Sequence, residues 1–258
     1  MNMNNSKKSE KSRGIVAFAD NTPTTDYVSI AHKTLSIAGR ILNLPYTILS
    51  NGPQKLDNYR YDIDHLEFVQ WNNLSRYRAF ELSPYDETLV IDADYLVLDS
   101  KLNDIFSIPW DYLLQRKSYA LTQEWPSSMG PYSLPFVWAT VFAFRKTPKA
   151  KLFFDLIQRI QNNYEYYHSL FNIKERNYRN DYAFAIADYI VNGYSLCNHS
   201  IPGNMLTVDQ TIESIDLKDS KLIVKDQNRS YVLPQMNLHI ISKKYLQSNN
   251  FNKLIEKL

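Results

Sequence analysis

Cysteine and glycine are scarce in this chain of 258 residues, which contains one cysteine and six glycines. Because Cys197 has no partner in the chain, no intramolecular disulfide can form, and a hydrophobic core must hold the fold together. So few glycines leave no glycine-rich loop to cradle phosphate, and neither a P-loop nor a dinucleotide-binding fingerprint is present. A Ser-His-Asp signature and a zinc-type Cys/His cluster are also missing. These absences favour metal-mediated binding of any diphosphate ligand.

Long hydrophobic runs are missing as well. The longest, PFVWATVFAF at residues 135–144, is far too short to span a bilayer. Residues 1–13 are polar and lack the apolar segment of a signal peptide, so we expect a disordered leader there. The sequence thus predicts a soluble cytoplasmic protein, in a bacterium or, if a phage encodes it, in the host cell. Its net charge of +2 neither demands nor excludes a nucleic-acid partner.

Short apolar runs alternate with helical spacing over the first hundred residues. Strands are expected at residues 14–19, 46–50, 66–71 and from 87 onward, with helices at 27–43 and 71–83. This alternation predicts an α/β fold with a mostly parallel, Rossmann-like central sheet flanked by helices in a single domain.

The second half of the chain has a more mixed pattern. It predicts a buried strand at 136–144, a long helix over 148–167 that begins at Pro148, and a helix at 180–193 that ends at Asn192 and Gly193. Short strands are expected around 222–224, 231–233 and 238–241, before a terminal helix. We therefore divide residues 14–258 into a nucleotide-binding half, about 14–110, and an acceptor-binding half, about 111–258.

Two aspartates interrupt the apolar stretch ETLVIDADYLVLD at residues 87–99. Carboxylates are costly to bury unless they are paired or bind a metal, yet Asp92 and Asp94 stand where a buried strand should end. Residues two apart on a strand point to one side, and ligands of open α/β sheets bind beyond the carboxyl ends of the strands. The pair predicts a Mg²⁺ or Mn²⁺ site completed by substrate phosphates, the alternative being a strand-end turn with caps or surface ion pairs. A second pair, Asp62 and Asp64, lies in a polar segment and is interpreted as a solvated turn.

The residues around the acid pair carry a family resemblance. The segment SRYRAFELSPYDETLVIDADYLVLDSKLNDIF, residues 75–106, resembles the core of nucleotide-sugar-dependent glycosyltransferases with the GT-A fold, most of all glycogenin and the bacterial lipopolysaccharide galactosyltransferases. Arg76 matches the basic residue before the family motif, Asp92-Ala93-Asp94 matches the motif, and residues 103–106 match the piece that follows. The resemblance implies a retaining, metal-dependent glycosyltransferase that uses Mn²⁺ or Mg²⁺ and a nucleotide-sugar donor, with UDP-sugars as the first candidates.

Flanking segments extend the resemblance to individual residues. Residues 17–38 are similar to the family's opening strand and loop, which implies that Tyr27 lies against the nucleotide base. The late segment NLHIISKKYL implies that His239 completes the metal shell and that Lys243 or Lys244 grips the diphosphate. The segment RNDYAFAIADYI implies that Asp181 faces the reacting sugar.

The resemblance therefore assigns three sets of residues. It places Asp92, Asp94 and His239 at the metal, and Asp92, Asp94 and Asp181 in catalysis. The residues that it places at the donor are Ala17, Ala19, Asp20, Asn21, Tyr27, Arg76, Ile91, Asp92, Ala93, Lys243 and Lys244. The chain departs from the family at residues 138–140, where Trp-Ala-Thr replaces a small polar triplet.

The acceptor stays open at this point. Residues 159–184 interleave tyrosines with Arg and Lys, and such surfaces can hold sugars, bases or phosphates. The acceptor could be a glycan, a lipid-linked sugar or modified DNA, the last as in phage transferases that glycosylate hydroxymethylated pyrimidines. Two other functions remain open, a nucleotidyltransferase and a non-catalytic module that binds sugar nucleotides or nucleic acid. The sequence does not decide the oligomeric state.

Overall fold

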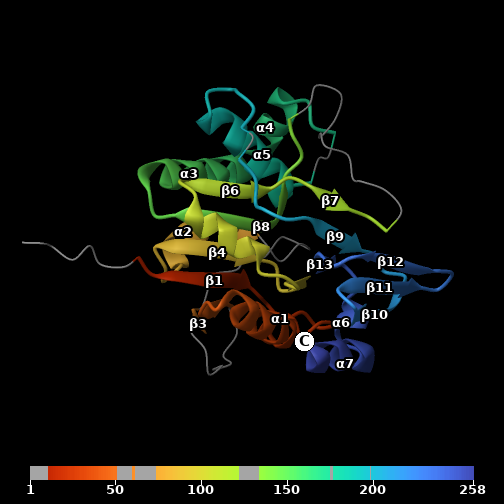
Figure 1. The fold of residues 1–258 in the computed structure, drawn as a ribbon. Coiled ribbons are helices and arrows are strands. Elements are labelled where there is room, and N and C mark those ends of the chain that lie inside the picture. The colour runs from red at the N-terminus through yellow and green to blue at the C-terminus, as the bar shows by residue number, and fades with distance from the viewer. Residues whose placement is uncertain (1–10, 51–59, 62–73, 122–133, 175–176, 198) are drawn as a thin grey trace, which may run out of the picture.

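The centre of the fold is a six-stranded sheet (Figure 1). The computed structural model describes residues 11–50, 60–61, 74–121, 134–174, 177–197 and 199–258. The strands lie in the order β3-β2-β1-β4-β8-β6; β8 runs antiparallel to β4 and β6, and the other pairings are parallel. The strands of this sheet are β1 (Arg13–Phe18), β2 (Tyr46–Leu49), β3 (Arg60–Tyr61), β4 (Glu87–Ile91), β6 (Tyr112–Gln115) and β8 (Trp138–Arg145). The mostly parallel α/β sheet predicted from the sequence is confirmed.

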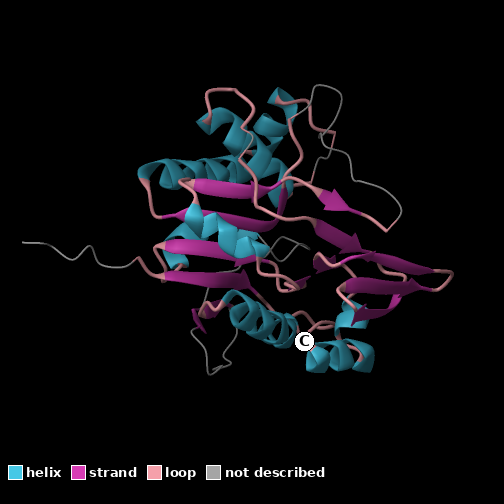
Figure 2. Cartoon of the chain, in the orientation of Figure 1, coloured by secondary structure: helices cyan, strands magenta, loops and turns pink. Residues whose placement is uncertain are grey.

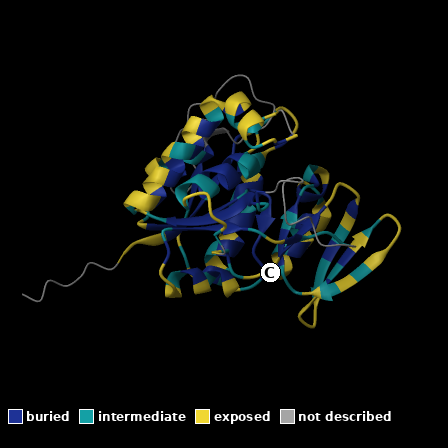
Figure 3. Ribbon diagram, turned by 90° about the horizontal axis from the view of Figure 1, so that it is seen from above, coloured by how far each residue is buried: buried dark blue, intermediate teal, exposed yellow. Residues whose placement is uncertain are grey.

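Helices cover both faces of this sheet. Successive residues of β1 alternate between the two layers, because Ile15 and Ala17 pack with α1 (Tyr27–Leu42), whereas Val16 and Phe18 pack in the cluster of α3 (Pro148–Asn162) and α5 (Asn180–Val191). Figure 3 shows the buried sheet between helices whose outer faces are exposed. The other helices are α2 (Ala79–Leu82), α4 (Tyr164–Leu170), α6 (Lys243–Leu246), α7 (Asn249–Lys257) and the 3-10 helices η1 (Leu74–Arg78) and η2 (Lys101–Ser107). Among the described residues, no helix combines the length and the apolar character needed to cross a membrane.

Two smaller sheets lie beside the central one (Figure 2). The first has the order β5-β13-β9-β7, and the second is an antiparallel sheet in the order β10-β11-β12. Their strands are β5 (Tyr95–Leu96), β7 (Ser118–Tyr119), β9 (Met205–Val208), β10 (Ile212–Lys218), β11 (Lys221–Asp226), β12 (Ser230–Pro234) and β13 (Asn237–Ile240). Because β5 follows β4 after only a short turn, the chain passes directly from the central sheet into the first small sheet.

Local sequence explains where the long helices begin and end. The Asp26 side chain caps α1 by accepting from the Ser29 backbone N–H at 3.0 Å. Thr147 caps α3 by accepting from Ala150 N at 3.2 Å, and Pro148 occupies the first turn as predicted. Gly193, just after α5, adopts a φ of +67°, a left-handed conformation that favours glycine.

Several expectations need correction. The helix expected at 71–83 is, over its described part, the 3-10 helix η1 followed by the single turn α2, which ends before Pro84. The long helix expected over 148–167 is divided at Asn163 into α3 and α4. The strand expected at 66–71, the Asp62 and Asp64 pair and most of the leader lie outside the described residues. Strands β3, β6, β7, β9 and β10 have no counterpart in the prediction.

Candidate metal and donor site

The acid pair lies in a tight turn at the carboxyl end of β4. All five residues of this strand are buried, and the strand ends at Ile91. The turn is fixed by three hydrogen bonds: Asp92 N donates to Thr140 O of β8 at 2.9 Å, Tyr95 N donates to Asp92 O at 3.0 Å, and Thr34 Oγ1 of α1 donates to Ala93 O at 2.8 Å. The backbone of the motif is therefore held between the sheet and a covering helix.

His239 reaches the acids through strand pairing. In the antiparallel pair of β13 and β5, His239 lies opposite Tyr95, and Ile240 N donates to Asp94 O at 3.0 Å. The ligand atoms of Asp92, Asp94 and His239 all lie within 4.8 Å of one another, and His239 Nε2 is 3.7 Å from Asp94 Oδ1. Two carboxylates and an imidazole are a donor set that fits a divalent cation. The three residues placed at the metal by the family resemblance are thus brought together.

A cation of the protein contacts each carboxylate. Arg76 forms an ion pair with Asp92 and also donates to Ala139 O, while Lys243 donates to Asp94 Oδ2. The Arg76 residue is only 2% exposed, whereas the Lys243 side chain is 27% exposed at the start of α6. Arg76 therefore holds Asp92 from inside the protein, whereas Lys243 lies at the solvent-exposed edge of the site.

Burial and charge shift the ionisation of these groups in different directions. Burial raises the pKa of Asp94, but Lys243 and His239 outweigh it, so this pKa lies below its ordinary value. Burial lowers the pKa of His239 despite the opposing charge of Asp94, which favours the neutral imidazole that a metal requires. Burial lowers the pKa of Arg76 to about 10, so that the guanidinium stays charged at neutral pH.

Asp181 lies in the first turn of α5 and is bonded within the protein. Its Oδ1 accepts from the Ala139 backbone N–H at 2.9 Å, and its Oδ2 accepts from Arg179 at 2.9 Å. The charge of Asp181 also acts on Arg76 and His239, which places it in the same electrostatic neighbourhood. In this arrangement Asp181 anchors the beginning of α5 to β8, and its contact with a sugar stays a prediction.

The residues predicted to surround the donor differ in how much of their surface a ligand could reach. Tyr27 is the first residue of α1, and Lys243 Nζ lies 5.6 Å from the centre of its ring. Asn21 Oδ1 accepts from Val28 N at 2.9 Å, so its side chain holds the loop before this helix. Ala17 and Ile91 have no exposed surface, so a direct contact of either with a donor would require the protein to move. The others that are buried are Ala19, Asp20 and Ala93, and Lys244 is exposed.

Two aromatic residues near the site were not predicted as functional. The Trp138 ring lies edge-on to the His239 ring, with centroids 6.3 Å apart, and is 8% exposed. Tyr178 is half-buried, desolvation raises its pKa, and the Arg76 charge acts on it. The only feature of the sequence that indicated Trp138 was the Trp-Ala-Thr at 138–140, which stands where the family has a small polar triplet. No feature of the sequence indicated Tyr178.

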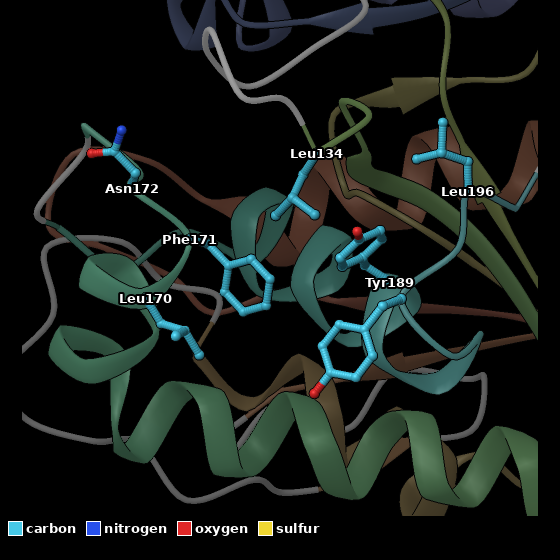
Figure 4. Close-up of a pocket in the computed structure, with 7 residues that line it drawn as sticks. Leu134, Leu170, Phe171, Asn172, Tyr189 and Leu196 are labelled. Carbon is cyan, nitrogen blue, oxygen red and sulfur yellow. The ribbon is translucent and has the colours of Figure 1, made fainter.

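A separate cavity of about 540 Å³ lies away from the acids (Figure 4). The described residues that line it are uncharged, and all but one are apolar or aromatic: Leu134, Leu170, Phe171, Asn172, Tyr189, Tyr194 and Leu196. Tyr189 follows Asp181 by about two turns of α5, or roughly 12 Å of helix. The cavity thus belongs to the far end of α5 and not to the metal site.

Comparison with known proteins finds similarity at the level of fold. No family model and no curated protein sequence matches the chain. A galactosyltransferase LgtC structure with donor and acceptor sugar analogues has a TM-score of 0.46 and 16% identity over 69% of this chain and 70% of that one. The glycosyltransferase GlyE of Streptococcus pneumoniae TIGR4 has a TM-score of 0.41 and 14% identity over 70% of this chain and 44% of that one. The bifunctional WbbM structure has a TM-score of 0.39 and 13% identity over 58% of this chain and 35% of that one. All three are described as glycosyltransferases, but at these TM-scores the similarity carries no argument about the reaction of this chain.

Proposed function

We propose that the protein is a metal-dependent glycosyltransferase that moves a sugar from a nucleotide-sugar donor, a UDP-sugar, to a hydroxyl acceptor. The observation that carries the proposal is the convergence of Asp92, Asp94 and His239 at the carboxyl end of β4, with Lys243 beside them. That is the edge of an open α/β sheet where ligands bind. Retention at the anomeric carbon, the choice of uridine and the choice of Mn²⁺ or Mg²⁺ rest on the family resemblance.

The proposed chemistry assigns a role to each charged group. As the anomeric C–O bond of the donor breaks, its electron pair passes to the diphosphate. The acceptor hydroxyl oxygen bonds to the anomeric carbon, and its proton is released to the departing diphosphate or to solvent. A divalent cation held by Asp92, Asp94 and His239 would stabilise the growing charge on the diphosphate. Lys243, which we favour over the exposed Lys244, would contact the diphosphate, and Tyr27 would lie against the base. Arg76 would hold Asp92 in place through their ion pair.

A thermal-shift experiment tests the donor. We expect a UDP-sugar with Mn²⁺ to raise the melting temperature, because a ligand that binds only the folded state stabilises it, by about 2.7 kcal/mol at one hundred times its Kd. GDP- and other nucleotide sugars, each with and without metal, form the comparison set. If no nucleotide sugar stabilises the protein in a metal-dependent way, the proposal fails.

A second experiment tests whether the charge of Asp181 matters to the reaction. Asp181→Asn keeps an oxygen that can accept from Ala139 N, so its melting temperature should stay close to that of the wild type. If the carboxylate faces the reacting sugar, kcat should fall about 100-fold while donor binding is unchanged. An unchanged kcat in Asp181→Asn would show that the charge of Asp181 has no part in the reaction and that the residue serves only to anchor α5 to β8.

The acceptor is proposed to bind to the half of the chain that carries α3, α4 and α5. Hydrolysis of the donor without acceptor gives the baseline rate, and candidate acceptors are then compared for faster UDP release. The panel contains an oligosaccharide, a lipid-linked sugar and DNA with hydroxymethylated pyrimidines. Stimulation by one class identifies the acceptor, and stimulation by DNA alone would establish the phage-type activity.

A further inference from the structure

Lys243 and the metal site share one carboxylate. The Lys243 ammonium donates to Asp94 Oδ2, and the other oxygen of Asp94 faces His239 Nε2 at 3.7 Å. A divalent cation bound by Asp94 would lie next to this ammonium, and two positive charges a few ångströms apart repel strongly where water is largely excluded. Binding of the cation therefore requires Lys243 to move away from Asp94.

Lys243 is free to make this move, whereas Arg76 is not. The Arg76 side chain is 3% exposed and is held both by Asp92 and by the carbonyl of Ala139. The Lys243 side chain is 27% exposed, and its ammonium lies 5.6 Å from the centre of the Tyr27 ring, on the side where the base is proposed to bind. A rotation of the flexible lysine side chain can carry its charge from Asp94 toward a ligand above Tyr27.

Among the described residues, each of the three acids assigned to catalysis is paired with a cation of the protein. Arg76 pairs with Asp92, Lys243 with Asp94 and Arg179 with Asp181. A divalent cation alone would leave an excess of positive charge, and a diphosphate alone an excess of negative charge. When both bind, positive and negative charge are added together. The Lys243 ammonium can then pair with the diphosphate, while the cation pairs with the Asp94 carboxylate.

We propose that Lys243 couples metal binding to diphosphate binding by exchanging Asp94 for the diphosphate. This inference rests on the proposed function and adds a prediction about metal affinity. The site binds Mn²⁺ weakly when the nucleoside diphosphate is absent and strongly when it is present. Because coupling is reciprocal, Mn²⁺ and UDP should each raise the affinity of the other by the same factor, which we expect to be at least about 10-fold.

The test is a titration of free Mn²⁺ by electron paramagnetic resonance, with and without saturating UDP. In the wild type, UDP should lower the Kd for Mn²⁺ at least about 10-fold. In Lys243→Met, Mn²⁺ alone should bind at least about 5-fold more tightly than in the wild type, since its competitor for Asp94 is gone, and UDP should then lower the Kd by a smaller factor than in the wild type. The matched control is Lys253→Met, the same change at an exposed lysine of α7, which should leave both constants at the wild-type values.

The outcomes separate this inference from the proposed function. Circular dichroism first establishes that each variant is folded. If the wild type binds Mn²⁺ with UDP but folded Lys243→Met binds Mn²⁺ alone no more tightly than the wild type, the exchange is wrong and the glycosyltransferase proposal stands. If Lys253→Met behaves as described for Lys243→Met, the effect is one of net charge and the assignment to Lys243 is wrong. If Mn²⁺ binds to no variant, with or without UDP, the metal-dependent function is overturned and the exchange with it.

Discussion

Asp94→Asn is expected to lower metal-dependent sugar transfer roughly 100- to 1,000-fold, the range that follows loss of a group that stabilises charge in a transition state. Asp94 stands where three elements meet: the turn after β4, His239 on β13 and Lys243 on α6. The amide of asparagine has the same shape but carries no charge, so it binds a divalent cation more weakly and cannot balance Lys243. The initial rate with UDP-sugar and Mn²⁺ measures the loss.

The same substitution should leave the fold almost unchanged. The backbone carbonyl of Asp94 still accepts from Ile240 N, and the partly exposed pair with Lys243 contributes only about 0–1 kcal/mol. The matched control is Asp104→Asn, the same change at an exposed acid of the same segment, which should keep wild-type turnover. Full activity in Asp94→Asn would refute the role of the acid pair, whereas equal losses in both variants would point to a general effect on folding.

The acid pair could be predicted because its signal is local. A mostly apolar run ends at Ile91, where the buried strand β4 also ends, and two aspartates separated by one residue follow it. The sequence itself therefore indicates a strand that ends at a polar edge. The position of His239 beside the pair depends on the pairing of β13 with β5, which joins residues far apart in the chain. No sequence period encodes that pairing, and only the family resemblance suggested it.

Other parts of the site depend on geometry that single-sequence patterns do not carry. Lys243 and Lys244 are adjacent lysines that the sequence alone does not distinguish. Because successive helical residues point about 100° apart, α6 directs Lys243 toward Asp94 and leaves Lys244 exposed. The short segment at 74–82 has apolar spacing that suits both an α-helix and the 3-10 helix found there. The 3-10 helix carries Arg76, whose buried contact with the sheet is a tertiary feature.

Arg76→Met is expected to have the largest effect on stability. Arg76 is 2% exposed and satisfies both the Asp92 carboxylate and the Ala139 carbonyl, so its loss leaves a mostly buried charge and a backbone oxygen without this partner. Breaking a buried ion pair by removing one side costs about 3–5 kcal/mol. Because the Asp92 side chain is 16% exposed, we expect the lower end, about 3 kcal/mol, measured as the free energy of unfolding in urea. Arg40→Met, at an exposed position of α1, should change it by less than about 0.5 kcal/mol.

A double-mutant cycle shows whether the uncompensated charge is the cause. If the loss in Arg76→Met comes from stranding Asp92, then adding Asp92→Asn should remove that charge and restore about 1–2 kcal/mol, so the double variant is more stable than the sum of the single effects predicts. If the two losses simply add, Arg76 stabilises the fold through Ala139 and packing, and not through the acid. Sugar transfer should be lost in the double variant in either case, because the carboxylate that the metal needs is gone.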